Sequence, residues 1–221
     1  MRSLILIHAL ILISFLSKGQ EFKPYRIDDS VQVSIPPTFQ KKDTLGQHII
    51  SAGTQFGNIL IIKTPDDPKR TPEIEKKSHL DAFYENYVKN ISSSVEGSII
   101  SGERDTTINN LRYKDFTLQA DSGGGKQYRN FRIVHVNSAT YIFQFLYQDV
   151  HKEYAASNIK SFFDGIKIPP DATVASQFTE PENTTGTPPT GSNYSMIGWG
   201  VGILILIVLI IFFIRRRKRL H

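Results

Sequence analysis

The sequence predicts an α+β domain, in which helices pack on an antiparallel β-sheet, followed by a single C-terminal transmembrane helix. Segments with the two-residue alternation of half-buried strands recur between residues 25 and 168. Two longer segments place apolar residues every three or four positions, as amphipathic helices do. Residues 196–214 contain no charged side chain and are followed directly by five basic residues.

The first half of the domain is predicted to contain three strands and a helix. Residues 31–35 alternate apolar and polar side chains, and 48–51 and 58–63 are further candidate strands. Thr71-Pro72-Glu73 has the composition of a helix start. Aromatic and aliphatic residues follow at helical spacing: Leu80, Phe83, Tyr84, Tyr87 and Ile91. We expect them to pack against the sheet rather than to hold a cofactor.

The second half is predicted to be an antiparallel meander. Its strands fall near 98–101, 111–118, 128–136 and 140–147, and the second of them loses its alternation near Asp115. Antiparallel sheets built from hairpins with short turns commonly bury one face and expose the other to solvent, which matches these patterns. A last helix is predicted from Val150 to Phe163, with Gly165 placed to end it.

Both ends of the chain predict attachment to a membrane. Arg2 precedes a short apolar run, so residues 1–19 have the pattern of a cleaved signal peptide. An extracytoplasmic domain then spans residues 20–170, and residues 171–195, rich in Thr, Pro, Ser and Asn, are expected to form a flexible stalk. Residues 196–214 are long enough for a helix of roughly 28 Å, close to the thickness of a bilayer's hydrocarbon core.

The basic tail, residues 215–221, fixes the predicted topology. Arg215, Arg216, Arg217, Lys218 and Arg219 are expected to stay in the cytoplasm. The domain is then expected on the other side of the cell membrane, which is the periplasm if the cell is Gram-negative. Trp199 is expected to anchor the helix at the lipid interface. Gly198 and Gly202 lie one helical turn apart, a spacing that permits a homodimer but is also common near the ends of membrane helices.

Charge and composition exclude several functions. The sequence pI of about 9.3 is typical of nucleic-acid binders. However, two basic residues precede residue 20 and five follow residue 214, which leaves 19 of the 26 against 21 acidic residues. The domain is therefore nearly neutral, and no nucleic-acid partner is predicted. The absence of cysteine excludes disulfides and thiolate metal sites, and favours a bacterial envelope over a eukaryotic ectodomain.

No motif predicts catalysis, a metal or a cofactor. The run from Gly123 to Lys126 superficially resembles a phosphate-binding loop, but the strand pattern after it indicates a hairpin turn. His48, His79, His135 and His151 never pair at the spacing of metal ligands. No nucleophile elbow for a serine hydrolase occurs. A non-enzymatic role is therefore favoured, and an enzymatic function is kept as an alternative.

The order of elements resembles the PsbP-like α/β sandwich family. The late strand Thr140–Tyr147, followed by the helical segment Ala155–Ile168 with its Ser-Phe-Phe sequence, is similar to the end of that family's domain. The opening pattern Val31-Gln-Val-Ser-Ile-Pro36 is similar to its first strand. The resemblance covers about residues 22–169 and implies an α+β sandwich in a family of mainly non-enzymatic assembly, scaffold and binding proteins. It transfers no functional residue to this chain.

Three hypotheses follow. The first is a non-catalytic, membrane-tethered protein that binds or assembles with another envelope protein. The second is an envelope enzyme or small-ligand carrier with a pocket lined by Tyr113, Tyr128, His135 and Tyr141, residues that equally suit packing within the sheet. The third is a eukaryotic type I surface receptor whose stalk carries glycans at Asn183 and Asn193.

Overall fold

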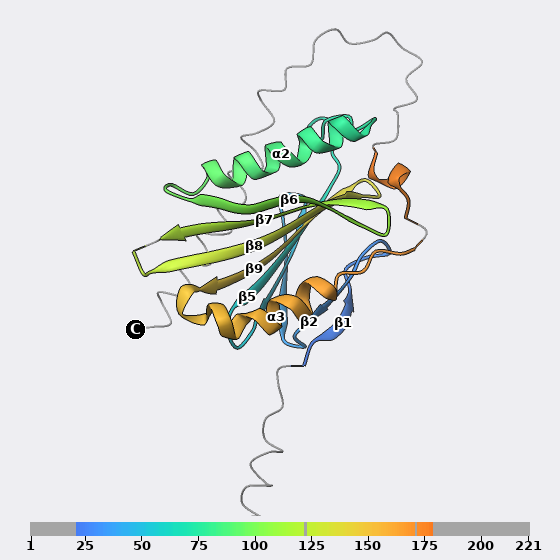
Figure 1. Ribbon diagram of the computed structural model, residues 1–221. Helices are drawn as coiled ribbons and strands as arrows, with labels where there is room; N and C mark the ends of the chain where they lie inside the picture. Colours follow the sequence, from blue (N-terminus) through green and yellow to red (C-terminus); the bar gives the residue numbers. More distant parts are fainter. Residues whose placement is uncertain (1–20, 122, 171, 179–221) are drawn as a thin grey trace, which may run out of the picture.

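The structure is a computed structural model that describes residues 21–121, 123–170 and 172–178. A seven-stranded antiparallel sheet has the order β3-β4-β5-β9-β8-β7-β6, and a separate hairpin pairs β1 with β2 (Figure 1). The strands are β1 (Lys23–Arg26), β2 (Gln32–Ile35), β3 (Phe39–Thr44), β4 (Gln47–Gly53), β5 (Asn58–Pro65), β6 (Ile99–Ile108), β7 (Leu111–Asp121), β8 (Lys126–Val136) and β9 (Ala139–Gln148). The helices are α2 (Lys77–Ser93), α3 (Lys152–Asp164) and the short 3-10 helices η1 (Asp149–His151) and η2 (Val174–Gln177).

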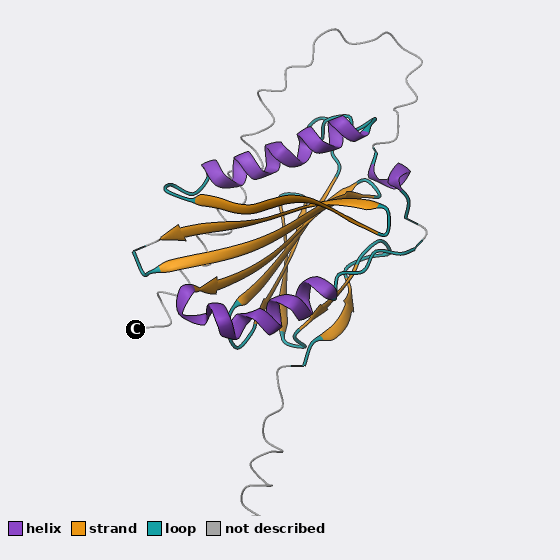
Figure 2. Ribbon diagram, viewed as in Figure 1, coloured by secondary structure: helices purple, strands orange, loops and turns teal. Residues whose placement is uncertain are grey.

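Helices cover both faces of the sheet, so the predicted α+β class is confirmed (Figure 2). The α2 face packs Leu80, Tyr84 and Ile91 of α2 against the sheet. The α3 face packs Phe162 of α3 and Val33 of β2 against Phe143 and other residues of β9, β5 and β8. Two apolar cores therefore lie on opposite sides of one sheet, as a sandwich requires.

The expectation that one face of the sheet is exposed to solvent was wrong. Residues 139–146 of β9 are buried at every position, because Tyr141, Phe143 and Phe145 point to the α3 face while Ile142 points to the α2 face. The apparent loss of alternation near Asp115 has the same cause. Tyr113 belongs to one core and Phe116 to the other, so apolar residues occur at both parities of β7.

Helix α2 begins at Lys77, later than the predicted start near Thr71. The Thr71 hydroxyl accepts a hydrogen bond from the Asp67 amide, and the Thr71 amide donates to the Asp67 carbonyl oxygen. Thr71 therefore closes a turn of its own and does not cap the helix. The aromatic stripe of α2 is placed as predicted, and Tyr84 and Ile91 are each 1% exposed.

The packed domain extends beyond the boundary predicted at residue 170. Residues 174–177 form η2, and the Gln177 side chain is fully buried. After α3, the chain forms one isolated antiparallel bridge, between Lys167 and Gln32 of β2. Among the described residues, no helix has both the length and the apolar character that crossing a bilayer requires. The predicted signal peptide and transmembrane helix lie outside those residues.

Candidate binding surface

The four residues predicted to line a pocket do not share one face of the sheet. Tyr113 and Tyr141 belong to the core on the α3 face, and Tyr128 pairs with Tyr147 on that same face. His135 points to the α2 face, where its ring centroid lies 5.5 Å from that of Phe83. The sheet therefore separates His135 from the three tyrosines.

Tyr141 holds the β1–β2 hairpin against the sheet. Its hydroxyl donates to Asp28 Oδ2 at 2.6 Å, and Lys63 Nζ lies 2.5 Å from the same oxygen. Burial acts to raise the pKa of Asp28, but the hydrogen bonds from Lys63 and Tyr141 outweigh it and lower that pKa below its ordinary value. This set joins the turn after β1 to β5 and β9 and has a structural role.

Tyr113 lies beneath a charge cluster that spans three strands. Asp115 accepts hydrogen bonds from Arg132 Nε and Nη2 at 2.8 and 2.9 Å and from the Thr106 hydroxyl at 3.1 Å. The Arg132 guanidinium lies 5.6 Å from the Tyr113 ring centroid. Because the buried carboxylate and guanidinium satisfy each other, the cluster joins β6, β7 and β8 and leaves neither group free for substrate chemistry.

His135 is fully buried beside Asp66. Its Nδ1 lies 3.2 Å from the Thr140 hydroxyl, and its Nε2 lies 3.6 Å from Asp66 Oδ2. Burial lowers the pKa of His135 to about 4 and raises that of Asp66 to about 6. At neutral pH a neutral imidazole therefore faces a carboxylate. Among the described residues, no group of three or more His, Cys, Asp or Glu side chains is arranged to hold a metal ion.

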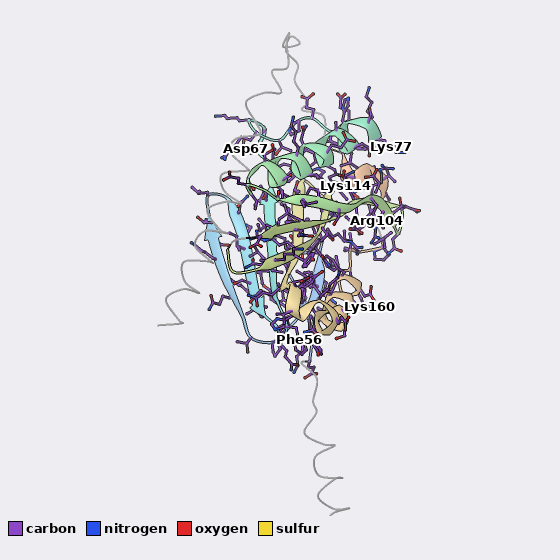
Figure 3. All side chains as sticks on the ribbon, turned by 60° about the vertical axis from the view of Figure 1, so that its left-hand side comes forward. Phe56, Asp67, Lys77, Arg104, Lys114 and Lys160 are labelled. Atoms are coloured by element: carbon purple, nitrogen blue, oxygen red, sulfur yellow. The ribbon has the colours of Figure 1, made fainter. Side chains whose placement is uncertain are left out.

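Exposed aromatic and apolar side chains gather at one end of the sheet. Val150 is 71% exposed and Tyr154 is 64% exposed. The Tyr154 ring stacks on Phe56 with centroids 5.4 Å apart and an interplanar angle of 30°, and the His151 ring meets Phe56 at 5.9 Å. We call Phe56, Val150, His151 and Tyr154 the Phe56 patch. Figure 3 shows Phe56 at the opposite end of the domain from Lys77, the first residue of α2.

Local sequence explains how Phe56 reaches this position. The turn between β4 and β5 is closed by hydrogen bonds from the Thr54 amide and hydroxyl to the Gly57 carbonyl oxygen, at 2.8 and 3.0 Å. A Cβ atom at Gly57 would lie 2.4 Å from the Leu146 carbonyl oxygen and 2.5 Å from Phe145 Cε1. Only glycine lets the turn approach β9 this closely, and that approach sets Phe56 beside the start of α3.

A second aromatic pair lies at the same end of the sheet. Tyr128 and Tyr147 stack with centroids 5.3 Å apart, and Lys152 Nζ lies 5.6 Å from the Tyr128 ring centroid. A hydrogen bond with Asp149 raises the pKa of the Tyr128 hydroxyl. Of the four predicted pocket residues, Tyr128 is the one whose surroundings border the exposed patch.

Sequence reasoning missed the Phe56 patch, although a signal for it exists. In the last predicted helix, Ala155, Ile159, Phe162 and Ile166 recur at helical spacing and form one apolar stripe. Val150 and Tyr154 lie off that stripe, and large apolar residues off the buried stripe of a helix are candidates for exposure. Phe56 gives no such signal, because its place beside α3 depends on the turn at Gly57.

The predicted membrane residues lie outside the described part of the chain. These are the interfacial Trp199, the glycine pair Gly198 and Gly202, and the basic residues Arg215, Arg216, Arg217, Lys218 and Arg219. Their assignments stay predictions.

No protein-family model and no curated protein matches this chain. Solved structures to which it is similar include a cyanobacterial PsbP from Synechocystis, at 8% identity and a TM-score of 0.49, covering 70% of this chain and 96% of that one. LpqN from Mycobacterium tuberculosis, described as involved in cell envelope biogenesis, has 10% identity and a TM-score of 0.42, with 67% of this chain and 91% of that one covered. The yeast Ran-binding protein Mog1p has 10% identity and a TM-score of 0.41, with 73% and 100% covered.

Proposed function

We propose that this protein is a non-catalytic, membrane-tethered module of a cell envelope that docks another envelope protein through the Phe56 patch. The observation on which this proposal depends is the exposure of Val150 (71%) and Tyr154 (64%) beside the partly buried ring of Phe56. Contiguous apolar surface that stays open to water is typical of an interaction site. The predicted signal peptide and transmembrane helix supply the tether.

The chemistry of the patch favours a protein partner. Tyr154 stacks one face of its ring on Phe56, which holds the ring with little conformational freedom. Rigid aromatic side chains of this kind contribute much of the binding energy in protein interfaces. Lys152 and Glu153 border the patch in sequence and provide a charged rim of both signs. We therefore expect a partner surface with an apolar recess for Tyr154 and polar groups around it.

The other exposed large apolar residues do not form a second patch among the described residues. Leu45 occupies the β3–β4 turn, Ile99 begins β6, and Val174 begins η2. Single exposed apolar side chains are normal on protein surfaces. Leu45, which is 67% exposed, is therefore a matched control for the patch.

The test is crosslinking and affinity capture of the full-length chain from native membranes. We compare wild type with the double variant Val150→Ser/Tyr154→Ser and with Leu45→Ser, all expressed at equal levels. A supporting result is a partner protein that wild type and Leu45→Ser recover reproducibly and that the double variant loses by about tenfold or more. Equal recovery by all three chains, or no reproducible partner, contradicts docking at the Phe56 patch.

A further inference from the structure

The hydrogen-bond ladder between β7 and β8 stops before the two strands do. It runs from Asp121 paired with Lys126 to Lys114 paired with Ile133. Beyond that point Arg112 pairs with Thr107 on β6, and His135 pairs with Thr140 on β9. The backbones of Arg112 and His135 thus flank a gap between β7 and β8, which we call the fork.

Two side chains take over the hydrogen bonds of the fork. The Tyr84 hydroxyl accepts from the His135 amide at 2.9 Å and donates to the Arg112 carbonyl oxygen at 3.0 Å. Gln177 Oε1 accepts from the Arg112 amide at 2.8 Å. Gln177 Nε2 lies 2.9 Å from the Arg112 carbonyl oxygen and 3.1 Å from that of His135. The Gln177 carboxamide therefore serves the fork as a neighbouring peptide group would.

Gln177 lies in residues 173–178, near the end of the described chain, which we call the strap. Its side chain is fully buried, and the Ser176 carbonyl oxygen accepts from the Asn137 amide at 2.7 Å. Phe178 packs against the core on the α2 face. Withdrawing the strap would leave the Arg112 amide and the His135 carbonyl without these partners, and a buried backbone group that loses its partner destabilises the structure around it.

The strap and the Phe56 patch lie at opposite ends of the sheet. His135 pairs with Thr140 near the start of β9, whereas Tyr128 pairs with Tyr147 near its end, next to η1 and α3. Figure 1 shows η2 beside the end of the sheet where α2 begins, and the start of α3 at the other end. The chain leaves the described domain from the strap.

We propose that the strap is a load-sensitive latch, which opens the fork when the chain beyond Phe178 is pulled. This inference rests on the proposed function, because load requires a partner that holds the Phe56 patch and a tether that holds the other end. The Phe56 patch and the strap lie at opposite ends of the sheet, so a force applied between them acts along the strands. To separate the strands, this force must break several hydrogen bonds of a β-ladder at the same time. The strap is held by the Gln177 side chain, the Ser176 carbonyl and the packing of Phe178, so it yields before the sheet. Its release exposes the fork and loosens α2 through Tyr84.

Hydrogen exchange on the full-length chain tests the latch without any partner. Gln177→Leu keeps the size of the side chain and removes its hydrogen bonds, so we expect exchange at the start of β7 and in the N-terminal half of α2 to accelerate by about tenfold or more. Ser176→Ala is the matched control, because the Ser176 hydroxyl donates only to the Thr173 carbonyl within the strap. Unchanged exchange in Gln177→Leu overturns the proposal.

Single-molecule pulling tests the response to load. The chain has no cysteine, so cysteines introduced at Ala156 and Thr179 are specific handles. We expect an early step of roughly 20 Å, the length of six extended residues, before the sheet unfolds. The step should need less force in Gln177→Leu and should be absent when handles at Ala156 and Lys23 bypass the strap. Unfolding without an early step overturns the latch, whereas loss of partner capture alone contradicts only the proposed function.

Discussion

The two ends of the sheet differ in how their surfaces are completed. At the strap end, the Tyr84 hydroxyl and the fully buried Gln177 carboxamide satisfy backbone groups of Arg112 and His135. At the patch end, rings stack on one another and remain open, with Tyr154 64% exposed. The strap end is closed to solvent by hydrogen bonds, which require a fixed geometry. The patch end exposes apolar surface to solvent, as interaction sites commonly do.

This difference supports the separate tasks that we propose for the two ends. Directional hydrogen bonds hold a segment in one place, and the strap end is where the chain leaves the domain. Aromatic stacking orders a side chain while keeping much of its surface available, which suits recognition of another molecule. A domain that is held at one end and binds at the other would keep the patch directed away from the strap.

The largest expected effect on stability comes from Gly57→Ala, which changes the patch end by displacing the backbone of the turn that carries Phe56. The new Cβ would lie 2.4 Å from the Leu146 carbonyl oxygen and 2.5 Å from Phe145 Cε1, so the turn must move. We expect a loss of about 2–3 kcal/mol in the free energy of unfolding, measured by denaturant titration. Partner capture should fall as well, because Phe56 moves with the turn.

Gly53→Ala is the control for this substitution. The nearest atom to a Cβ at Gly53 is Asn58 Oδ1 at 4.0 Å, an ordinary contact. We expect it to change the free energy of unfolding by no more than about 1 kcal/mol. Equal losses in the two glycine variants would show that the close approach of the turn to β9 has no special role.

The next effect concerns the strap end and follows from Tyr84→Phe. Removing the hydroxyl takes an acceptor from the His135 amide and a donor from the Arg112 carbonyl oxygen, both at a buried position. We expect the free energy of unfolding to fall by about 2 kcal/mol. Tyr154→Phe, at an exposed ring, should change it by less than about 0.5 kcal/mol. Similar values for the two tyrosines would remove the distinction between a sealed end and an open one.

Sequence periodicity predicts the sheet, the two helices and most of the core, because a buried stripe leaves a local signal. The aromatic residues of α2 show this, with Leu80, Tyr84 and Ile91 each at most 1% exposed. Burial on both faces of β9 was not predicted, because it depends on which elements cover the sheet. Strands β1 and β3 were also missed: Lys23–Arg26 and Phe39–Thr44 are short, polar and mostly exposed, so alternation is absent from them.

The two ends of the sheet were the least predictable parts. Gln177 lies in a segment whose composition indicates a flexible linker, and its role appears only when the fork between β7 and β8 is known. The Phe56 patch joins residues nearly 100 positions apart in sequence. Tyr113, Tyr128, His135 and Tyr141 are predicted to line one pocket, but the sheet is covered on both faces and His135 points to the face opposite the three tyrosines.

A smaller effect depends on pH and tests the strap end at Asp66→Asn. Burial raises the pKa of Asp66 to about 6 from an ordinary value of 3.8, so the folded state holds this proton more tightly than the unfolded state. The stability that Asp66 contributes is therefore present below about pH 4 and is lost as the pH rises through 6. We expect Asp66→Asn to gain about 1–2 kcal/mol over wild type between pH 4 and pH 7.

The groups that face Asp66 shape this measurement. His135 Nε2 lies 3.6 Å from Asp66 Oδ2, and the Thr71 hydroxyl donates to the carboxylate. Burial lowers the pKa of His135 to about 4, so its contribution to stability rises with pH over the same window and opposes that of Asp66 in wild type. Comparing the two chains at each pH by denaturant titration isolates Asp66. A difference that does not vary with pH would contradict a raised pKa.

The smallest effect on stability is expected at the patch itself, from Tyr154→Ser. The ring is 64% exposed and its contact with Phe56 covers only one face, so we expect the free energy of unfolding to change by no more than about 0.5 kcal/mol. Partner capture should nevertheless fall strongly, because an exposed rigid ring contributes its burial energy only when a partner covers it. A large loss of stability in this variant would show that Tyr154 supports the fold, and the patch would then lose its assignment as a binding surface.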